Sequence, residues 1–177
     1  MTSAVKVQEE SRIVKAMLRE LQREAITTKR VLERVPADQL SWKPKPKSMT
    51  LGQLANHVAM IPGNLSKLAQ VEEFDASSAN FDPPMPKDVQ EVLATLDAGV
   101  KAAQEYVGGL TETALDSQWR MVLQGKQILA MSRLEFLRSI MFNHWYHHRG
   151  QLSVYLRLLD VPVPSIYGPS ADENPFG

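Results

Sequence analysis

Hydrophobic side chains recur every three or four residues along four long stretches of the chain. That spacing places them on one face of an α-helix, so each stretch predicts an amphipathic helix. The stretches run from about Ile13 to Pro36, from Ser48 or Thr50 to Leu68, from about Asp88 to Gly108-Gly109, and from about Ser132 to Leu159. Pro62 lies inside the second stretch, where it is expected to kink the helix or to remove one backbone hydrogen bond.

Three other segments lack helical periodicity. Residues 75–87 are rich in Asp, Ser and Pro, which predicts a loop. Residues 119–131 carry two short apolar runs around Gln124-Gly125-Lys126, which favours a small β-hairpin before the last helix, with an extended loop as the alternative. Residues 160–177 contain four prolines and two glycines, so we expect an extended C-terminal tail. Because that tail also carries apolar side chains, it is expected to pack on the helices.

The predicted elements indicate an all-α protein, a four-helix bundle joined by one or two long connections. At 177 residues the chain has the length of one domain, and no internal repeat or linker divides it. We therefore expect a single domain over 1–177, with the tail packed on it.

Composition narrows the functional classes. The chain has no cysteine, so a metal ion would have to be held by nitrogen and oxygen atoms. Twenty basic residues balance twenty acidic ones, and the densest basic run, residues 43–47, is short and interrupted by proline, which disfavours nucleic-acid binding. No apolar run approaches the roughly 20 residues that span a bilayer, and no apolar signal-peptide core is visible, so we expect a cytoplasmic protein.

The histidines are the residues with the clearest chemical meaning. His57 falls on the apolar face of the second helix, and His144 and His148 fall on the apolar face of the fourth. At about 100° per residue, positions 144 and 148 differ by only about 40° around the helix axis. Buried imidazoles without partners would each cost roughly 1–3 kcal/mol, whereas one metal ion satisfies all three. The spacing predicts a divalent metal site, with hydrogen-bonded core histidines as the alternative.

Three imidazoles describe an open site, because closed structural zinc sites use four protein ligands whereas catalytic sites leave a position for water or substrate. Imidazole ligands suit zinc, nickel, iron or copper; we expect zinc or nickel, with iron also compatible. His147 lies roughly 60° from His144 around the axis and is expected to be a partly buried, hydrogen-bonded residue near the site, with metal ligation as the alternative. The zinc-protease mechanism is excluded because Trp145 stands where that chemistry needs a glutamate.

Five polar residues lie close to the predicted site on the two histidine-bearing helices. Each would either support a metal ligand or contact a neighbouring helix or solvent; they are Gln53, Asn56, Tyr146, Arg149 and Gln151. For Arg149, a salt bridge to another helix is favoured over binding of an anionic substrate. Tyr167 of the tail is expected either to cover an apolar groove or to place its hydroxyl at the rim of the site.

One run of the fourth helix, His144-Trp-Tyr-His-His-Arg-Gly-Gln-Leu152, resembles the H-x-x-H-H-R-G-Q-L motif of the DinB/YfiT-like metal-binding superfamily. The segments 40–44 and 48–57 are similar to that family's first ligand segment, and residues 163–173 are similar to the tail of one of its branches. The resemblance thus spans nearly the whole chain. It implies an up-down-down-up four-helix bundle, commonly a homodimer, in which His57, His144 and His148 bind the metal.

Some relatives in that superfamily use low-molecular-weight thiols such as bacillithiol or mycothiol as cosubstrates. The resemblance therefore suggests a metal-dependent enzyme, with a thiol-dependent S-transferase as the leading hypothesis and a small molecule as the substrate. A metal-dependent hydrolase is the runner-up among enzymes. A non-catalytic protein that binds a metal or a ligand is the rival from another class. Fold-level analogy does not supply the substrate.

Overall fold

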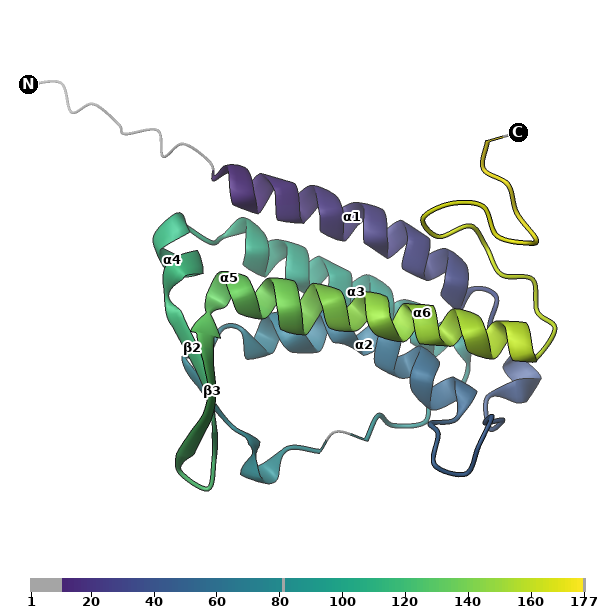
Figure 1. The fold of residues 1–177 in the computed structure, drawn as a ribbon, viewed down its shortest axis with the longest axis horizontal. Helices are drawn as coiled ribbons and strands as arrows, with labels where there is room; N and C mark the ends of the chain where they lie inside the picture. Colours follow the sequence, from purple (N-terminus) through teal and green to yellow (C-terminus); the bar gives the residue numbers. More distant parts are fainter. Residues whose placement is uncertain (1–10, 81, 177) are drawn as a thin grey trace, which may run out of the picture.

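The computed structural model describes residues 11–80 and 82–176, and this part of the chain is mostly helical with a small three-stranded sheet (Figure 1). The long helices are α1 (Arg12–Leu32), α2 (Leu51–Leu68), α3 (Val89–Gly108) and α6 (Asn143–Leu158). Short helical elements are η1 (Ala37–Gln39), η2 (Ala76–Ser78), α4 (Glu112–Asp116), α5 (Arg133–Glu135) and η3 (Phe136–Phe142). The strands are β1 (Glu73–Asp75), β2 (Gln118–Leu123) and β3 (Lys126–Ser132).

Side-chain caps start the long helices at the predicted positions. Ser11 accepts a hydrogen bond from the Val14 amide at the start of α1, and Asp88 accepts one from the Glu91 amide at the start of α3. Of the two caps considered for α2, Thr50 is the one used, in a reciprocal capping box with Gln53. The helix α2 then continues through Pro62 to Leu68 as one element.

The last long helix is built from three consecutive elements. The helix begins at the predicted place, where Ser132 and Glu135 form a capping box, and helical winding then continues to Leu158. The unpredicted feature is η3, seven residues wound as a π-helix, in which the Asn143 amide donates to the Arg138 carbonyl five residues back. Turns of this wider kind are rare, and many of those that occur in proteins lie at functional sites. This one immediately precedes the turn that carries His144.

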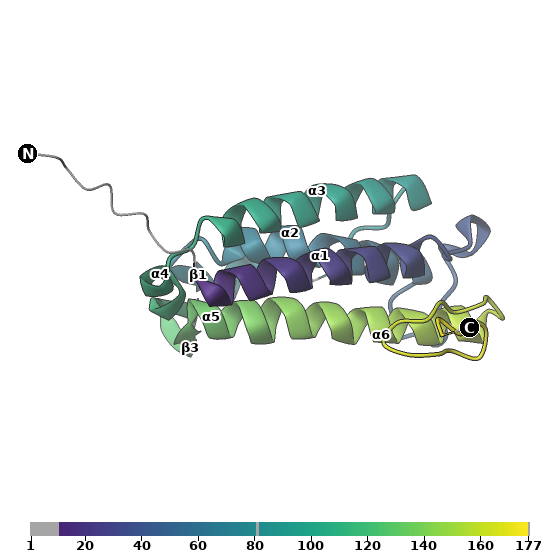
Figure 2. The ribbon, with the colours of Figure 1, turned by 90° about the horizontal axis from the view of Figure 1, so that it is seen from above.

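The long helices pack side by side. Helix α2 contacts α3 and α6, and α1 also contacts α3 and α6. Figures 1 and 2 show that α1 and α6 run in one direction and that α2 and α3 run in the other. Helices α2 and α3 approach closely at Gly63 and Gly99, where a Cβ atom on Gly63 would lie 2.8 Å from the Gly99 Cα. None of the helices in the described ranges is both long enough and apolar enough to cross a lipid bilayer.

The sheet corrects the expectation of an all-α protein. The predicted hairpin is confirmed: β2 and β3 pair antiparallel around Gln124 and Gly125, which both have positive φ. The expected loop over residues 75–87 is wrong at its start, because Asp75 ends β1, which pairs parallel with β2. Trp119 of β2 donates from its indole Nε1 to the Leu68 carbonyl at 3.2 Å, which fixes the sheet to the end of α2.

The C-terminal tail lies along α1 and α6. Val163 and Ser165 are buried, and Arg30 of α1 donates to the Ser165 carbonyl at 3.2 Å. Ion pairs join Arg30 to Glu173 and Arg157 to Asp172. That residues 1–177 form one domain stays a prediction, since residues 1–10 lie outside the described part of the chain.

Candidate metal centre

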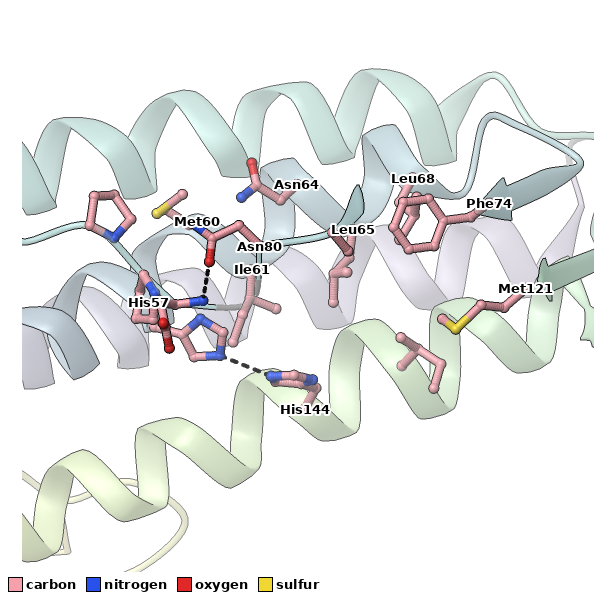
Figure 3. A pocket seen from close by; sticks show the side chains of 15 residues that line it. His57, Met60, Ile61, Asn64, Leu65, Leu68, Phe74, Asn80, Met121 and His144 are labelled. Carbon is pink, nitrogen blue, oxygen red and sulfur yellow. Dashed lines mark hydrogen bonds between the residues drawn. The ribbon is translucent and has the colours of Figure 1, made fainter. Parts of the chain in front are cut away.

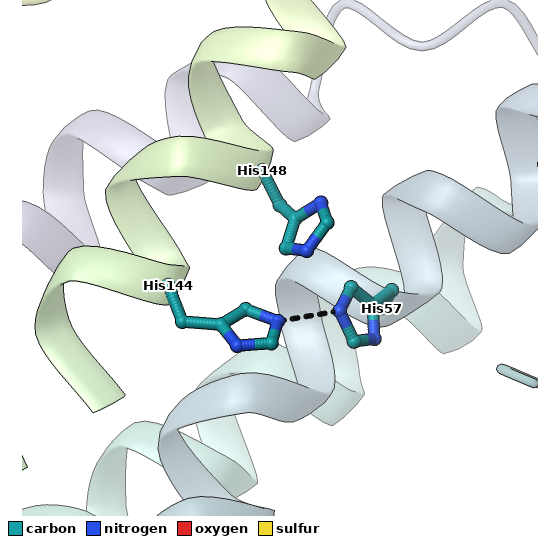
Figure 4. A group of neighbouring side chains, drawn as sticks. All are labelled: His57, His144 and His148. Carbon is teal, nitrogen blue, oxygen red and sulfur yellow. Dashed lines mark hydrogen bonds between the residues drawn. The ribbon is translucent and has the colours of Figure 1, made fainter. Parts of the chain in front are cut away.

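Three partly buried imidazole rings from two helices face one another (Figure 4). The Nε2 atoms of His57 on α2 and His144 on α6 are 3.0 Å apart. The ring centroid of His148 lies 4.5 Å from that of His57 and 4.5 Å from that of His144. One nitrogen of each ring lies within 4.8 Å of the other two. The three residues that the sequence singled out are therefore brought together, in a group that can hold a metal ion.

The orientation of His148 is fixed from its own helix. Its Nδ1 atom lies 2.9 Å from the Oε1 atom of Gln151, three residues further along α6. Because Oε1 only accepts hydrogen bonds, Nδ1 carries the proton and Nε2 keeps a free lone pair. A polar partner on the second ring nitrogen is the usual arrangement around a metal-ligating histidine. Of the five polar residues considered near the site, Gln151 is the one that contacts a candidate ligand.

The three imidazoles are held in their neutral form. Burial, and then the neighbouring His148 and His144, lower the pKa of His57 to about 4. Burial, and then His148 and His147, lower the pKa of His144 to about 4 as well. Burial also lowers the pKa of His148. Neutral imidazoles are the form that binds a metal ion, so the rings are ready for ligation near neutral pH.

His147 takes no part in this group, and the expectation that it is partly buried is wrong. Its side chain is exposed, and its ring meets the His148 ring nearly edge-on, with 4.8 Å between centroids. Within residues 11–80 and 82–176, no Asp or Glu joins the three histidines at ligand distance. The protein supplies three nitrogen donors, which leaves further coordination positions for water or substrate.

A cavity of about 620 Å³ opens beside the candidate centre and touches His57 and His144 (Figure 3). From there it follows α2 toward the sheet. Its walls are mainly apolar, with Met60, Ile61, Leu65, Leu68, Phe74 and Met121 as main contributors. Cavities of this volume and character bind small molecules in many proteins.

Five described residues of the segment 79–84 line one side of this cavity: Ala79, Asn80, Asp82, Pro83 and Pro84. Asn56 of α2 donates to the Pro84 carbonyl at 2.9 Å, and Gln53 donates to the Pro83 carbonyl at 3.4 Å. These two amides, considered above as neighbours of the metal, instead tie the segment down next to His57. The sequence predicted a loop in this region but gave no indication that it would form a cavity wall.

Arg149 lies on the side of α6 that faces α1. It is 1% exposed, pairs with Glu24 at 2.7 Å and donates to the Thr28 Oγ1 atom at 3.0 Å. The favoured interpretation, a salt bridge to another helix, is confirmed. Tyr167 joins this pair, because its hydroxyl lies 2.5 Å from an Arg149 nitrogen and 3.0 Å from a Glu24 oxygen. Tyr167 thus serves the contact between tail and helices, and it is absent from the walls of the cavity.

Comparison with known proteins gives a consistent result. The model of the DinB family matches residues 5–174. The uncharacterized protein YrdA of Bacillus subtilis is 29% identical over 157 residues, which is 85% of each chain. The crystal structure of a DinB-like protein from Bacillus cereus superposes with a TM-score of 0.67 at 22% identity, over 86% of this chain and 97% of the other. The DinB-like protein YjoA of B. subtilis gives a TM-score of 0.64 at 18% identity, over 85% and 96%.

The structural likeness shows a DinB-like fold, and the family match extends over most of the sequence, including all three candidate ligands. The chain belongs to the DinB family.

Proposed function

We propose that the protein binds one divalent metal ion through His57, His144 and His148 and uses it as a metal-dependent enzyme. The observation that carries the proposal is the convergence of three imidazoles at the mouth of a cavity. Their donor atoms are all nitrogen, and the hydrogen bond from His148 to Gln151 leaves a lone pair facing the group. These residues fit zinc or nickel best, and iron is compatible.

The leading reaction is a thiol-dependent S-transfer to a small molecule. A bound divalent ion lowers the pKa of a thiol or water at its open position. Around it, His57 and His144 border the cavity and orient whatever enters, while the segment 79–84 and the sheet limit the access of water. Hydrolysis is the second candidate, supported by the same open position.

A non-catalytic role in metal or ligand binding is the rival. A large apolar cavity that touches two of the three ligands favours the enzyme, since a purely structural ion needs no such space. We also infer the up-down-down-up four-helix bundle, supported by the helix directions in Figure 1. A homodimer in the cytoplasm without nucleic-acid or membrane partners completes the proposal.

Elemental analysis of the purified protein, followed by assays with a panel of low-molecular-weight thiols and electrophilic acceptors, tests this function. The proposal expects one metal ion per chain and thiol consumption that stops when the metal is removed. Consumption of acceptor by water, at a rate independent of thiol, would show the hydrolase. A metal-loaded protein without either activity would support the binding role.

A further inference from the structure

The cavity beside the histidines runs along helix α2. Its α2 wall carries His57, Ile61, Leu65 and Leu68, which follow one another at helical spacing along one face. From His57 to Leu68 this face spans roughly 16 Å at 1.5 Å per residue. The cavity is therefore elongated, with the candidate metal centre near one end (Figure 3).

The other end is formed by the sheet. Phe74 of β1 and Met121 of β2 are direct partners in the parallel pair, and both side chains line the cavity. The bond from Trp119 to the Leu68 carbonyl holds this sheet against the end of α2. Both ends of the cavity are thus built from anchored elements, which is the condition for selecting a ligand by length.

The charged residues of the cavity walls determine which ligand charge is tolerated. Among the described residues that line the cavity there is no Lys or Arg, and Asp82 is the carboxylate among them. An anionic group lying along α2 would lose its hydration and gain no counter-ion. Uncharged hydrocarbon, by contrast, gains from every methylene that leaves water.

We propose that this cavity binds an uncharged, elongated apolar small molecule, with its polar end at His57 and His144 and its hydrocarbon part along α2 toward Phe74 and Met121. The placement of the polar end rests on the proposed function, whereas the placement of the hydrocarbon part does not.

Displacement of the uncharged dye Nile red by straight-chain alcohols from butanol to decanol tests the proposal, with chelator-treated and metal-loaded protein in parallel. The inhibitory concentration is expected to fall about three- to fourfold per added methylene until the cavity is filled. Met121→Trp narrows the far end of the cavity. In this variant the inhibitory concentration should stop falling at a shorter alcohol, while butanol still binds as in the unmodified protein. Ile128→Trp, at a half-exposed position on β3 outside the cavity, is the matched control and should leave the series unchanged.

Equal potency of all alcohols, or a series that Met121→Trp leaves unchanged, would overturn the proposal. Alkyl hydroxamates of the same lengths separate it from the proposed function, because their head group binds divalent metals. If metal strengthens the hydroxamates while chain length has no effect, the metal site stands and the cavity inference fails. If chain length matters while metal adds nothing, the cavity inference stands and the proposed function fails.

Discussion

At the scale of single residues, the hydrogen bond between His148 and Gln151 decides which ring nitrogen faces the other histidines. Without the Gln151 oxygen, the ring could rotate or place its proton on Nε2. Partners of this kind change metal affinity by about 10- to 100-fold in other proteins. The side chain of Gln151 therefore prepares the site although it is not itself a candidate ligand.

Gln151→Leu should weaken metal binding about 10- to 100-fold without loss of helix, because it removes this partner and no donor. Competition with a chromophoric chelator measures the affinity, and circular dichroism checks the fold. The control is Gln90→Leu, at an exposed position of α3. Equal affinity of the Gln151 and Gln90 variants would show that His148 needs no support.

Glu20 is the second residue with a testable electrostatic role. It accepts hydrogen bonds from Arg138 and from the Tyr146 hydroxyl, and so joins α1 to the last helix. Burial raises the pKa of Glu20, but the bonds from Arg138 and Tyr146 outweigh it, so the pKa lies below its ordinary value of 4.5. A carboxyl group whose pKa is lowered by folding stabilises the protein above the unfolded pKa and loses that effect as the pH falls through the folded pKa.

Glu20→Gln should lower the free energy of unfolding by about 1 kcal/mol at pH 7, because it replaces hydrogen bonds to a charged carboxylate with neutral ones. The loss is modest because solvent partly screens the pair. The difference from the unmodified protein should shrink as the pH falls below about 4.5. Urea unfolding at several pH values measures it, with the exposed Glu105→Gln as control. A difference that stays constant down to pH 3 would contradict this account of the pair.

The candidate ligands could be predicted from the sequence because His144 and His148 are one helical turn apart and His57 lies on another apolar face. The sequence indicated that one of five polar residues could support a ligand, but it did not show that this residue is Gln151. The choice depends on side-chain rotamers, since Gln53 and Asn56 lie four residues and one residue before His57 but turn toward the carbonyl groups of residues 83 and 84.

At the scale of elements, the contact between α2 and α3 depends on two glycines. A Cβ atom on Gly63 would lie 2.8 Å from the backbone of Gly99, so the helices cannot stay at their present distance with a larger residue there. Gly150 on α6 is different, because a Cβ atom there would meet nothing within 4 Å. The two positions form a natural pair for comparison.

Gly63→Ala should lower the free energy of unfolding by about 1–3 kcal/mol, since overpacking outweighs the better helix propensity of alanine. Gly150→Ala should raise it by about 0.5–1 kcal/mol, since only the propensity gain applies. Thermal or urea unfolding measures both. A stabilising Gly63→Ala would mean that α2 and α3 separate at little cost.

Three helix starts could be predicted because a residue type that caps helices stands directly before apolar periodicity, at Thr50, Asp88 and Ser132. The β-hairpin could be predicted from its glycine-containing turn. The strand β1 could not, because three residues are too few to show alternation and its partner β2 lies more than forty residues away. The π-helical winding of η3 has no counterpart in the hydrophobic pattern, which fits an ordinary α-helix there.

At the scale of the whole molecule, the C-terminal tail joins α1 to α6. Val163 is buried, and Tyr167 connects Arg149 with Glu24. The prolines of the tail reduce the entropy that is lost when it is fixed on the helices. The tail therefore contributes to stability through burial and through the pairing of a buried arginine.

Deletion of residues 162–177 should lower the free energy of unfolding by about 2–3 kcal/mol, chiefly through the lost burial around Val163. The melting temperature measures this loss. The control is Phe176→Ala, which removes a side chain of the same tail that is 79% exposed and should leave the melting temperature unchanged. An unchanged melting temperature for the truncated chain would make the tail a passive appendage.

The cavity could not be predicted from the sequence, because its walls come from α2, the segment 79–84, the sheet and the last helix. No local pattern records that these segments meet. Phe74 and Met121 illustrate this, since nothing in the sequence relates them until the parallel pairing of β1 with β2 brings them together. The candidate metal site was accessible to sequence reasoning because one helix carries two of its three candidate ligands.

The most direct test of the central claim is the metal content of single-histidine variants purified under identical conditions. The unmodified protein is expected to hold one divalent ion per chain, and His57→Ala, His144→Ala and His148→Ala should each lose most of it while remaining helical. His147→Ala is the matched control, because that exposed neighbour lies outside the group, and it should keep the ion. Equal metal content in all four variants, or an unmodified protein that stays metal-free when offered zinc or nickel, would contradict the three-histidine site.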